Sequence, residues 1–294
     1  MKGGISVTQD FNDIGISREL DWARIRKLLA IGLFAAALHF AGDMILGWGM
    51  EDETLTGLPR MLSAYTATSD GGLFAAALLG LLGMTLEGLS MFGIYRLIVS
   101  RSPAYAHRYR AGIFGDLIFG PAAHVLICAL VFLTKYGFED TLRLRFVRYF
   151  LLPAAGLYWL SLIALNITHI AVFAKGLTPY PRWCWAFSMA VGMLLPVVCM
   201  VFGNHPFWNA FYCGWIAFGT LWMFAGLLIW LPKVQKGDRQ ASRLVLARHS
   251  PLRRHRRPER GDHKHLLKTT REQNAHGWFF APDCGMIVSR SKGG

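Results

Sequence analysis

Long apolar runs separated by short polar segments are the main pattern along this chain. The first run, residues 28–49, reads LLAIGLFAAALHFAGDMILGWG. It is long enough to cross a bilayer, because a helix needs about 20 apolar residues to span roughly 30 Å of hydrocarbon. Five further runs follow, at residues 72–99, 112–135, 149–174, 183–202 and 207–231. The pattern predicts an all-α, polytopic membrane helix bundle with six transmembrane helices.

Polar segments at the two ends divide the chain into three parts. Residues 1–27 form an N-terminal segment that ends in basic residues, residues 28–231 hold the six predicted spans, and residues 232–294 form a basic tail. The tail shows no sustained apolar period and cannot bury a core, so we expect it to be disordered.

Composition agrees with a membrane protein. The chain has 53% hydrophobic residues, 17% charged residues and a mean hydropathy of +0.34, whereas a soluble domain carries about a quarter charged residues. The formal net charge of +13 would fit a nucleic-acid partner, but 15 of the 31 Lys and Arg residues follow residue 232. The basicity therefore belongs to the tail, where it indicates topology or contact with anionic lipid, and nucleic acid is not an expected partner.

The distribution of Lys and Arg predicts the orientation. Basic residues are concentrated in the N-terminal segment, in the loops after the second and fourth runs, and in the tail, and the loop after the first run is acidic. By the positive-inside rule, both termini lie in the cytoplasm. The loop after the third run is the exception, because it carries Arg143, Arg145 and Arg148.

Ionisable residues inside the apolar runs are the candidate functional residues, because they are costly within hydrocarbon and usually face a bundle interior or a wet cavity. His39 and Asp43 lie four residues apart in the first run and therefore share one helix face. In the second run Glu87 continues a stripe of small residues, and in the third Asp116 and His124 recur on a row with glycines. The predicted intramembrane polar site consists of His39, Asp43, Glu87, Asp116, His124 and His169.

Each of these residues also has a structural interpretation. A single intramembrane histidine can be a hydrogen-bonded packing residue, and Asp116 lies near enough to an interface to be solvated there. The rise of about 1.5 Å per residue places His39 and His124 near the bilayer centre, Asp43 in the outer third, and Glu87 and Asp116 in the inner third.

Motifs for metals and redox chemistry are absent from the sequence. The five cysteines form no CxxC pair, and the chain contains no HExxH. Spacing alone therefore predicts no metal site and assigns no cofactor.

Three segments carry a resemblance to a known family. They are AGDMILGWG at residues 41–49, GIYR at residues 93–96 and GDLIFGPAAH at residues 115–124. Over residues 28–231 the chain resembles an uncharacterised bacterial family of six-span integral membrane proteins. The resemblance implies a bacterial cytoplasmic (inner) membrane protein with a shared polar core, and it implies no activity.

Three classes of function are compatible with these observations. The first is a small-solute carrier coupled to protons or cations, in which the His/Asp/Glu cluster forms the ion path. The second is an intramembrane enzyme acting on a lipid or a small apolar substrate, with a haem-binding variant that uses His39 and His124. The third is a non-catalytic scaffold or sensor whose polar residues hold the bundle together. The sequence does not identify the substrate or the oligomeric state.

Overall fold

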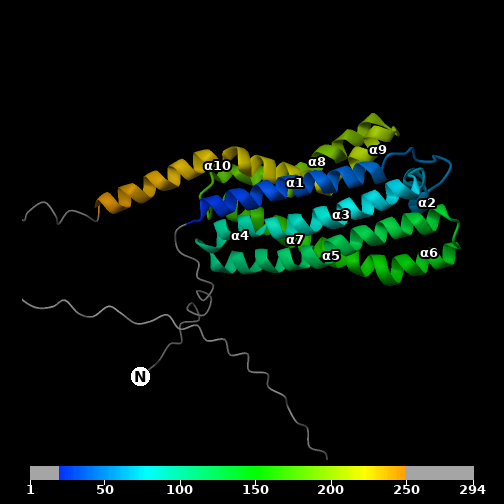
Figure 1. Cartoon of the computed structure of the whole chain (residues 1–294), viewed down its shortest axis with the longest axis horizontal. Helices are drawn as coiled ribbons and strands as arrows, with labels where there is room; N and C mark the ends of the chain where they lie inside the picture. Colours follow the sequence, from blue (N-terminus) through cyan, green and yellow to red (C-terminus); the bar gives the residue numbers. More distant parts are fainter. Residues whose placement is uncertain (1–19, 249–294) are drawn as a thin grey trace, which may run out of the picture. The chain divides into compact units, whose positions relative to one another are not determined.

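The structure is a computed structural model that describes residues 20–248 of the chain. Within this range the chain forms helices and no strands (Figure 1). The α-helices are α1 (Trp22–Leu46), α2 (Gly57–Thr66), α3 (Asp70–Ser90), α4 (Phe92–Val99), α5 (Pro103–Lys135), α6 (Asp140–Phe146), α7 (Leu152–Ala174), α8 (Met189–Cys199), α9 (Pro206–Cys213) and α10 (Trp215–Arg248). A π-helix, η1 (Val147–Leu151), and two 3₁₀-helices, η2 (Arg182–Phe187) and η3 (Met200–Phe202), connect some of them.

Five helical stretches are long and apolar enough to cross a membrane. They are Trp22–Leu46, Asp70–Val99, Pro103–Lys135, Asp140–Ala174 and Trp215–Gln240. Large side chains such as Phe74 and Ile229 are about 70% exposed on the outer faces of these helices, where lipid would cover them. The prediction of an all-α membrane helix bundle is confirmed.

The structure differs from the prediction at the fifth span. Residues 182–187 form the 3₁₀-helix η2, and only Met189–Phe202 continues as an apolar helix. A helix of that length rises about 21 Å, which is less than the thickness of the hydrocarbon core. A count of apolar residues does not distinguish a 3₁₀ turn from the α-helix that follows it.

The predicted sixth span and tail boundary also need correction. The run at 207–231 is divided at Gly214 between α9 and α10, and α10 continues through Pro232 as far as Arg248. Residues 232–248 are therefore helical and are not part of a disordered tail. The rest of the predicted tail, residues 249–294, and residues 1–19 lie outside the described range.

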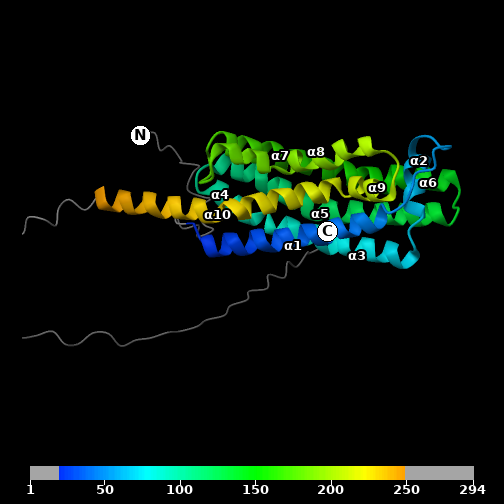
Figure 2. The same ribbon diagram turned by 90° about the horizontal axis from the view of Figure 1, so that it is seen from above.

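Helices α1, α3 and α5 form the part of the bundle that carries the polar residues. Helix α3 packs between α1 and α5, and α7 packs on the other side of α5 (Figures 1 and 2). Glycines allow the close approach of α1 and α3. A Cβ atom on Gly42 would lie 3.0 Å from the carbonyl oxygen of Ala76, and one on Gly83 would lie 2.8 Å from the backbone nitrogen of His39. Such contacts between small residues bring helix backbones together in membranes.

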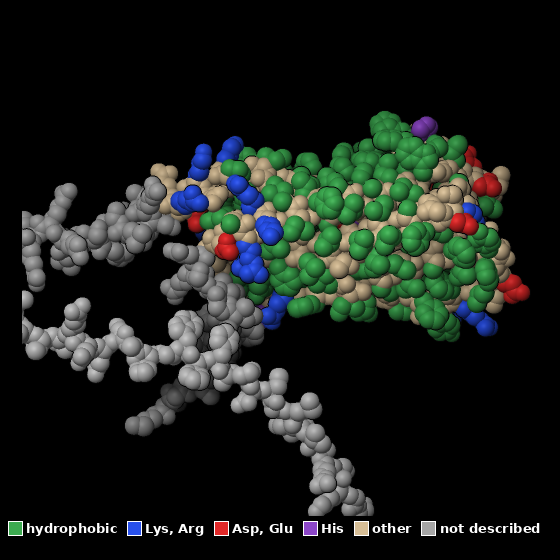
Figure 3. Space-filling model, in the orientation of Figure 1, with side chains coloured by type: hydrophobic (Ala, Val, Ile, Leu, Met, Phe, Trp, Pro, Cys, Tyr) green, Lys and Arg blue, Asp and Glu red, His purple; other side chains and the backbone are tan. Residues whose placement is uncertain are grey.

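The first and last described helices meet at one end of the bundle. The indole Nε1 of Trp22 donates a hydrogen bond of 3.2 Å to Oδ2 of Asp238, which joins the start of α1 to α10. In Figure 3 the Lys and Arg side chains on the visible face gather mainly at this end, near α4 and the later part of α10. The α1–α2 loop, which contains Glu51 and Asp52, lies at the opposite end of the bundle (Figure 1), where Figure 3 shows acidic side chains.

Candidate functional site

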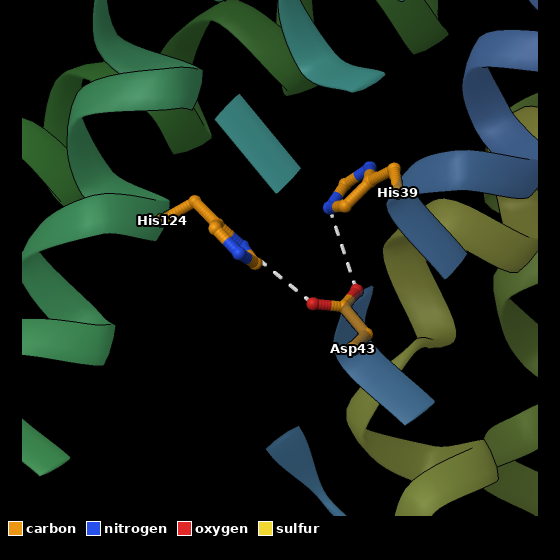
Figure 4. A group of neighbouring side chains, drawn as sticks. All are labelled: His39, Asp43 and His124. Atoms are coloured by element: carbon orange, nitrogen blue, oxygen red, sulfur yellow. Dashed lines mark ion pairs between the residues drawn. The ribbon is translucent and has the colours of Figure 1, made fainter. Parts of the chain in front are cut away.

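His39, Asp43 and His124 meet in the interior of the bundle. His39 and Asp43 lie one turn apart on α1, and His124 reaches them from α5 (Figure 4). Nε2 of His39 lies 3.4 Å from Oδ2 of Asp43, and Nδ1 of His124 lies 3.5 Å from Oδ1 of the same carboxylate. All three side chains are less than 10% exposed. One carboxylate therefore connects two imidazoles that the sequence placed at the same depth.

Glu87 extends this cluster towards the basic end of the bundle. Its Oε1 lies 3.1 Å from Nδ1 of His39, on the side of the ring away from Asp43. Asp116 is also buried. Its Oδ2 lies next to Gly88, the residue that follows Glu87 on α3. The Asp116 carboxyl group is therefore close enough to interact electrostatically with the Glu87 carboxyl group. The structure thus brings five of the six predicted site residues into one region, on three adjacent helices.

The glycine stripe of α3 creates the space that the two histidines occupy. An added Cβ atom on Gly80 would overlap the ring of His124, and one on Gly83 would lie 2.8 Å from Cβ of His39. The small residues predicted to share a face are buried, as expected for a stripe that faces other helices. Larger residues at these positions would keep α3 too far from α1 and α5 for the cluster to form.

Hydrogen-bond partners on the far side of each ring determine which nitrogen carries a hydrogen. Nε2 of His124 lies 3.1 Å from the carbonyl oxygen of Ala76. A carbonyl can only accept, so Nε2 is the donor, and the neutral ring has a free lone pair on Nδ1, which faces Asp43. Nδ1 of His39 lies 3.1 Å from Oε1 of Glu87. With a Glu87 carboxylate as the acceptor, this nitrogen is the donor, and Nε2 of the neutral ring then faces Asp43 with a lone pair.

A cavity of about 290 Å³ lies beside the cluster. His39, Asp43 and His124 line part of it, and the rest of the wall is mostly apolar. The apolar wall includes Met61 and Leu62 of α2, Ile127 of α5, Trp159 of α7 and Ile216 of α10. The polar cluster therefore borders a largely hydrophobic cavity. Because residues of α2 line part of this cavity, it extends towards the acidic end of the bundle.

His169 is buried apart from this cluster. Its ring stacks on Phe173 of the same helix, with centroids 4.4 Å apart, and neither ring nitrogen has a hydrogen-bond partner among the described residues. No contact of the described chain joins it to His39, Asp43 or His124. His169 therefore lies outside the region that holds the other five predicted site residues.

Three groups at the site were not identified from the sequence. The carbonyl of Ala76 belongs to the backbone, which a search for ionisable side chains does not consider. Cys128 is not among the predicted site residues, yet its Sγ lies 3.8 Å from Nε2 of His124. Tyr158 lines the cavity and contacts the Gly120 position. For Cys128 the sequence did contain a signal, because Asp116, Gly120, His124 and Cys128 follow one another at intervals of four residues and so share one helix face.

The arrangement disfavours haem and favours a small ion. The rings of His39 and His124 are nearly perpendicular, with centroids 5.5 Å apart, and the Asp43 carboxylate bridges them. A porphyrin between two axial histidines would have to displace that carboxylate. By contrast, one ligand atom from each of the three residues lies within 4.8 Å of the others, which is close enough for a single metal ion.

Comparison with known proteins identifies a family and no activity. A family model described as a family of unknown function (DUF6796) matches residues 11–234, and the chain therefore belongs to this family. No curated protein and no solved structure is similar enough to match the chain.

Proposed function

Because membership of a family of unknown function assigns no activity, we propose from the site that this membrane protein is a carrier for a small solute, coupled to protons or cations. The observation that carries this proposal is the linked series His124–Asp43–His39–Glu87, which crosses from α5 to α1 to α3 through contacts of 3.1–3.5 Å. We further propose the bacterial inner membrane as its location, with the basic end of the bundle in the cytoplasm.

A linked series of titratable groups suits the binding and transfer of a proton. Imidazole and carboxylate groups in contact pass a proton by exchanging donor and acceptor roles, and such residues commonly mark proton routes in transporters. Stability alone explains the series poorly, because interhelical hydrogen bonds in membranes average about 0.6 kcal/mol while buried ionisable groups are costly. The polar residues therefore have a use beyond holding α1, α3 and α5 together.

The cavity suggests how a solute would reach this series. It lies next to Asp43 and extends towards α2, whereas the basic end of the bundle is filled by buried apolar residues such as Ile25, Ile94 and Ile113. A carrier whose coupling groups lie at the inner end of its solute cavity would have this arrangement.

The test is proton movement by the purified protein in vesicles. The parent protein is expected to change the internal pH of vesicles under an imposed proton gradient, and Asp43→Asn should abolish this flux, because Asn retains the shape and hydrogen bonds but cannot ionise. His169→Gln is the matched control: it replaces another buried intramembrane histidine, outside the series, and should retain the flux. Full flux with Asn at position 43 would contradict the coupling role.

An intramembrane enzyme is the second candidate, favoured by the apolar lining of the cavity. The wall contributed by Leu130, Trp159 and Ile216 suits an acyl chain or another apolar substrate, whose polar end would meet Asp43 and the two histidines. In this case the histidines and the carboxylate would act as acid and base or as metal ligands. A chemically altered lipid recovered from vesicles that contain the parent protein, and absent with Asp43→Asn, would favour this candidate over the carrier.

A further inference from the structure

We propose that His39, Asp43 and His124 form a binding site for one divalent transition-metal ion, of which Zn²⁺ is the representative. The ligand atoms would be Nε2 of His39, the Asp43 carboxylate and Nδ1 of His124. The role of the ion rests on the proposed function, since it would be the cation of the coupling site, whereas its binding is a separate matter that can be measured without transport.

The lone pairs of the two histidines are directed at the same carboxylate. With Nε2 of His124 donating to Ala76 and Nδ1 of His39 donating to Glu87, both remaining ring nitrogens face the oxygens of Asp43. Nitrogen lone pairs and an ionised carboxylate repel one another at 3.4–3.5 Å unless a positive charge lies among them. A metal ion satisfies all three at once, whereas a proton can lie between only one nitrogen and one oxygen.

Each histidine also has a hydrogen-bond partner on the side of its ring away from Asp43. Metal-binding histidines nearly always donate their other ring N–H to a carboxylate or a backbone carbonyl, which orients the ring and raises its basicity as a ligand. Here Glu87 is the carboxylate for His39, and Ala76 provides the carbonyl for His124. Both histidines therefore have the supporting partner expected of a metal ligand, contributed by α3.

A divalent ion would also balance the charge of this group of residues. The two carboxylates in contact with the histidines, Asp43 and Glu87, carry two negative charges when ionised, and imidazoles that bind a metal ion through a lone pair are neutral. A divalent ion makes the whole group neutral, which greatly lowers the cost of burying these carboxylates within a membrane. In the absence of the ion, the same neutrality requires protons on the carboxylates or on the histidines.

The distances require only small adjustment. Bonds of about 2.0–2.1 Å in tetrahedral geometry place ligand atoms about 3.3 Å apart. The two oxygens of Asp43 lie 3.4 Å from Nε2 of His39 and 3.5 Å from Nδ1 of His124, close to this spacing, and one ligand atom from each of the three residues lies within 4.8 Å of the others. Small rotations of the two rings would close the site. Its fourth position faces the cavity, so water or a substrate group can occupy it.

Metal binding is tested with Zn²⁺ and with Co²⁺ as its spectroscopic substitute. The full chain, purified without a histidine tag, is placed in nanodiscs and stripped with a chelator. We expect one equivalent of Co²⁺ to give visible d–d bands of tetrahedral intensity, and Zn²⁺ to displace it. The chain holds ten histidines, so stoichiometry alone does not assign the site, and the variants must do so.

Variants distinguish the ligands from the outer shell. His124→Gln should lose the Co²⁺ bands, and Glu87→Gln should keep them with a Kd about 10–100-fold weaker, since loss of an outer-shell partner typically has that effect. His169→Gln is the matched control and should bind like the parent. If His124→Gln does not fold, Glu87→Gln still tests the site, because it keeps every ligand.

Two results would overturn the proposal. One is a folded parent protein that gives no Co²⁺ bands at millimolar metal, and the other is an unchanged Kd in both His124→Gln and Glu87→Gln. Failure of the carrier gives a different result, namely normal metal binding with no flux in vesicles. Flux that persists after chelation would retain a proton-coupled carrier and reject the metal ion as its coupling cation.

Discussion

His124 of α5 lies directly over Gly80 of α3, at a distance where an added Cβ atom would overlap the imidazole ring. The absence of a side chain lets the ring approach the backbone of α3 and hydrogen-bond to the carbonyl of Ala76, one turn earlier. That carbonyl can accept a second bond besides its helical one, because it has two lone pairs. The position of His124 in the cluster therefore depends on a glycine in another helix.

Gly80→Ala should destabilise the protein. Adding a methyl group to a well-packed interior typically costs about 1–3 kcal/mol, and here the ring of His124 has to move away from Ala76. We expect a lower melting temperature in detergent and weaker Co²⁺ binding. Gly71→Ala is the control on the same helix, because a Cβ atom there meets nothing within 4 Å. Equal melting temperatures for the two variants would show that His124 does not lie over Gly80.

The sequence predicted the faces of the helices better than it predicted their partners. Spacing of four residues placed His39 beside Asp43, and the structure confirms this contact. The same spacing placed Asp116 and His124 on one face of α5. The contact between His39 and Glu87 depends on the register of α1 against α3, which periodicity within either helix does not determine. His169 was a candidate for the same reason as the others, because it is an ionisable residue inside an apolar run, but its ring stacks on Phe173.

Helix boundaries were predicted where polar residues end an apolar run, and the start of the predicted fourth span shows how this rule fails. The stretch Asp140–Ala174 begins nine residues before the predicted span at 149, because α6 and the π-helix η1 continue directly into α7. The chain passes through η1 just before Pro153, which lacks an N–H for a regular helical bond. Arginines 143, 145 and 148 therefore lie on helical turns rather than in a loop.

Gly120→Leu should impair assembly of the bundle. A Cβ atom at this position would lie 3.0 Å from Cε of Met84 and 3.1 Å from the ring of Tyr158, so a leucine must displace both or enter the cavity. Gly156→Leu is the matched control, because Gly156 of α7 is exposed and has open space around it. We expect Gly120→Leu to elute as aggregate in size-exclusion chromatography, and Gly156→Leu to elute like the parent.

Labelling of single cysteines tests the orientation. Thr56→Cys, in the acidic loop, should react with an impermeant maleimide added outside intact cells, and Lys236→Cys, near the basic end, should react only after lysis. Cys184 is expected to contribute little background, because burial raises the pKa of its thiol to about 11 and maleimides need the thiolate. Labelling of Lys236→Cys in intact cells would reverse the proposed orientation.

Asp43→Leu and Asp43→Asn together separate a structural role of the cluster from a functional one. Leucine removes the carboxylate that the two imidazole nitrogens share through a proton or a metal ion, and each buried polar group left without a partner typically costs about 1–3 kcal/mol. Asparagine can still donate to one of these nitrogens and fill the same space. We therefore expect Asp43→Leu to melt well below the parent and Asp43→Asn to melt close to it.

The two roles then differ in activity. If the cluster serves only to hold α1 and α5 together, Asp43→Asn should keep whatever flux or metal binding the parent shows. If Asp43 acts by its charge, Asp43→Asn should keep its stability and lose flux and metal binding together. Melting curves and Co²⁺ titrations on the same samples would decide between these outcomes. A leucine variant as stable as the parent would mean that the two ring nitrogens are satisfied without Asp43, which contradicts the hydrogen-bond arrangement on which both proposals depend.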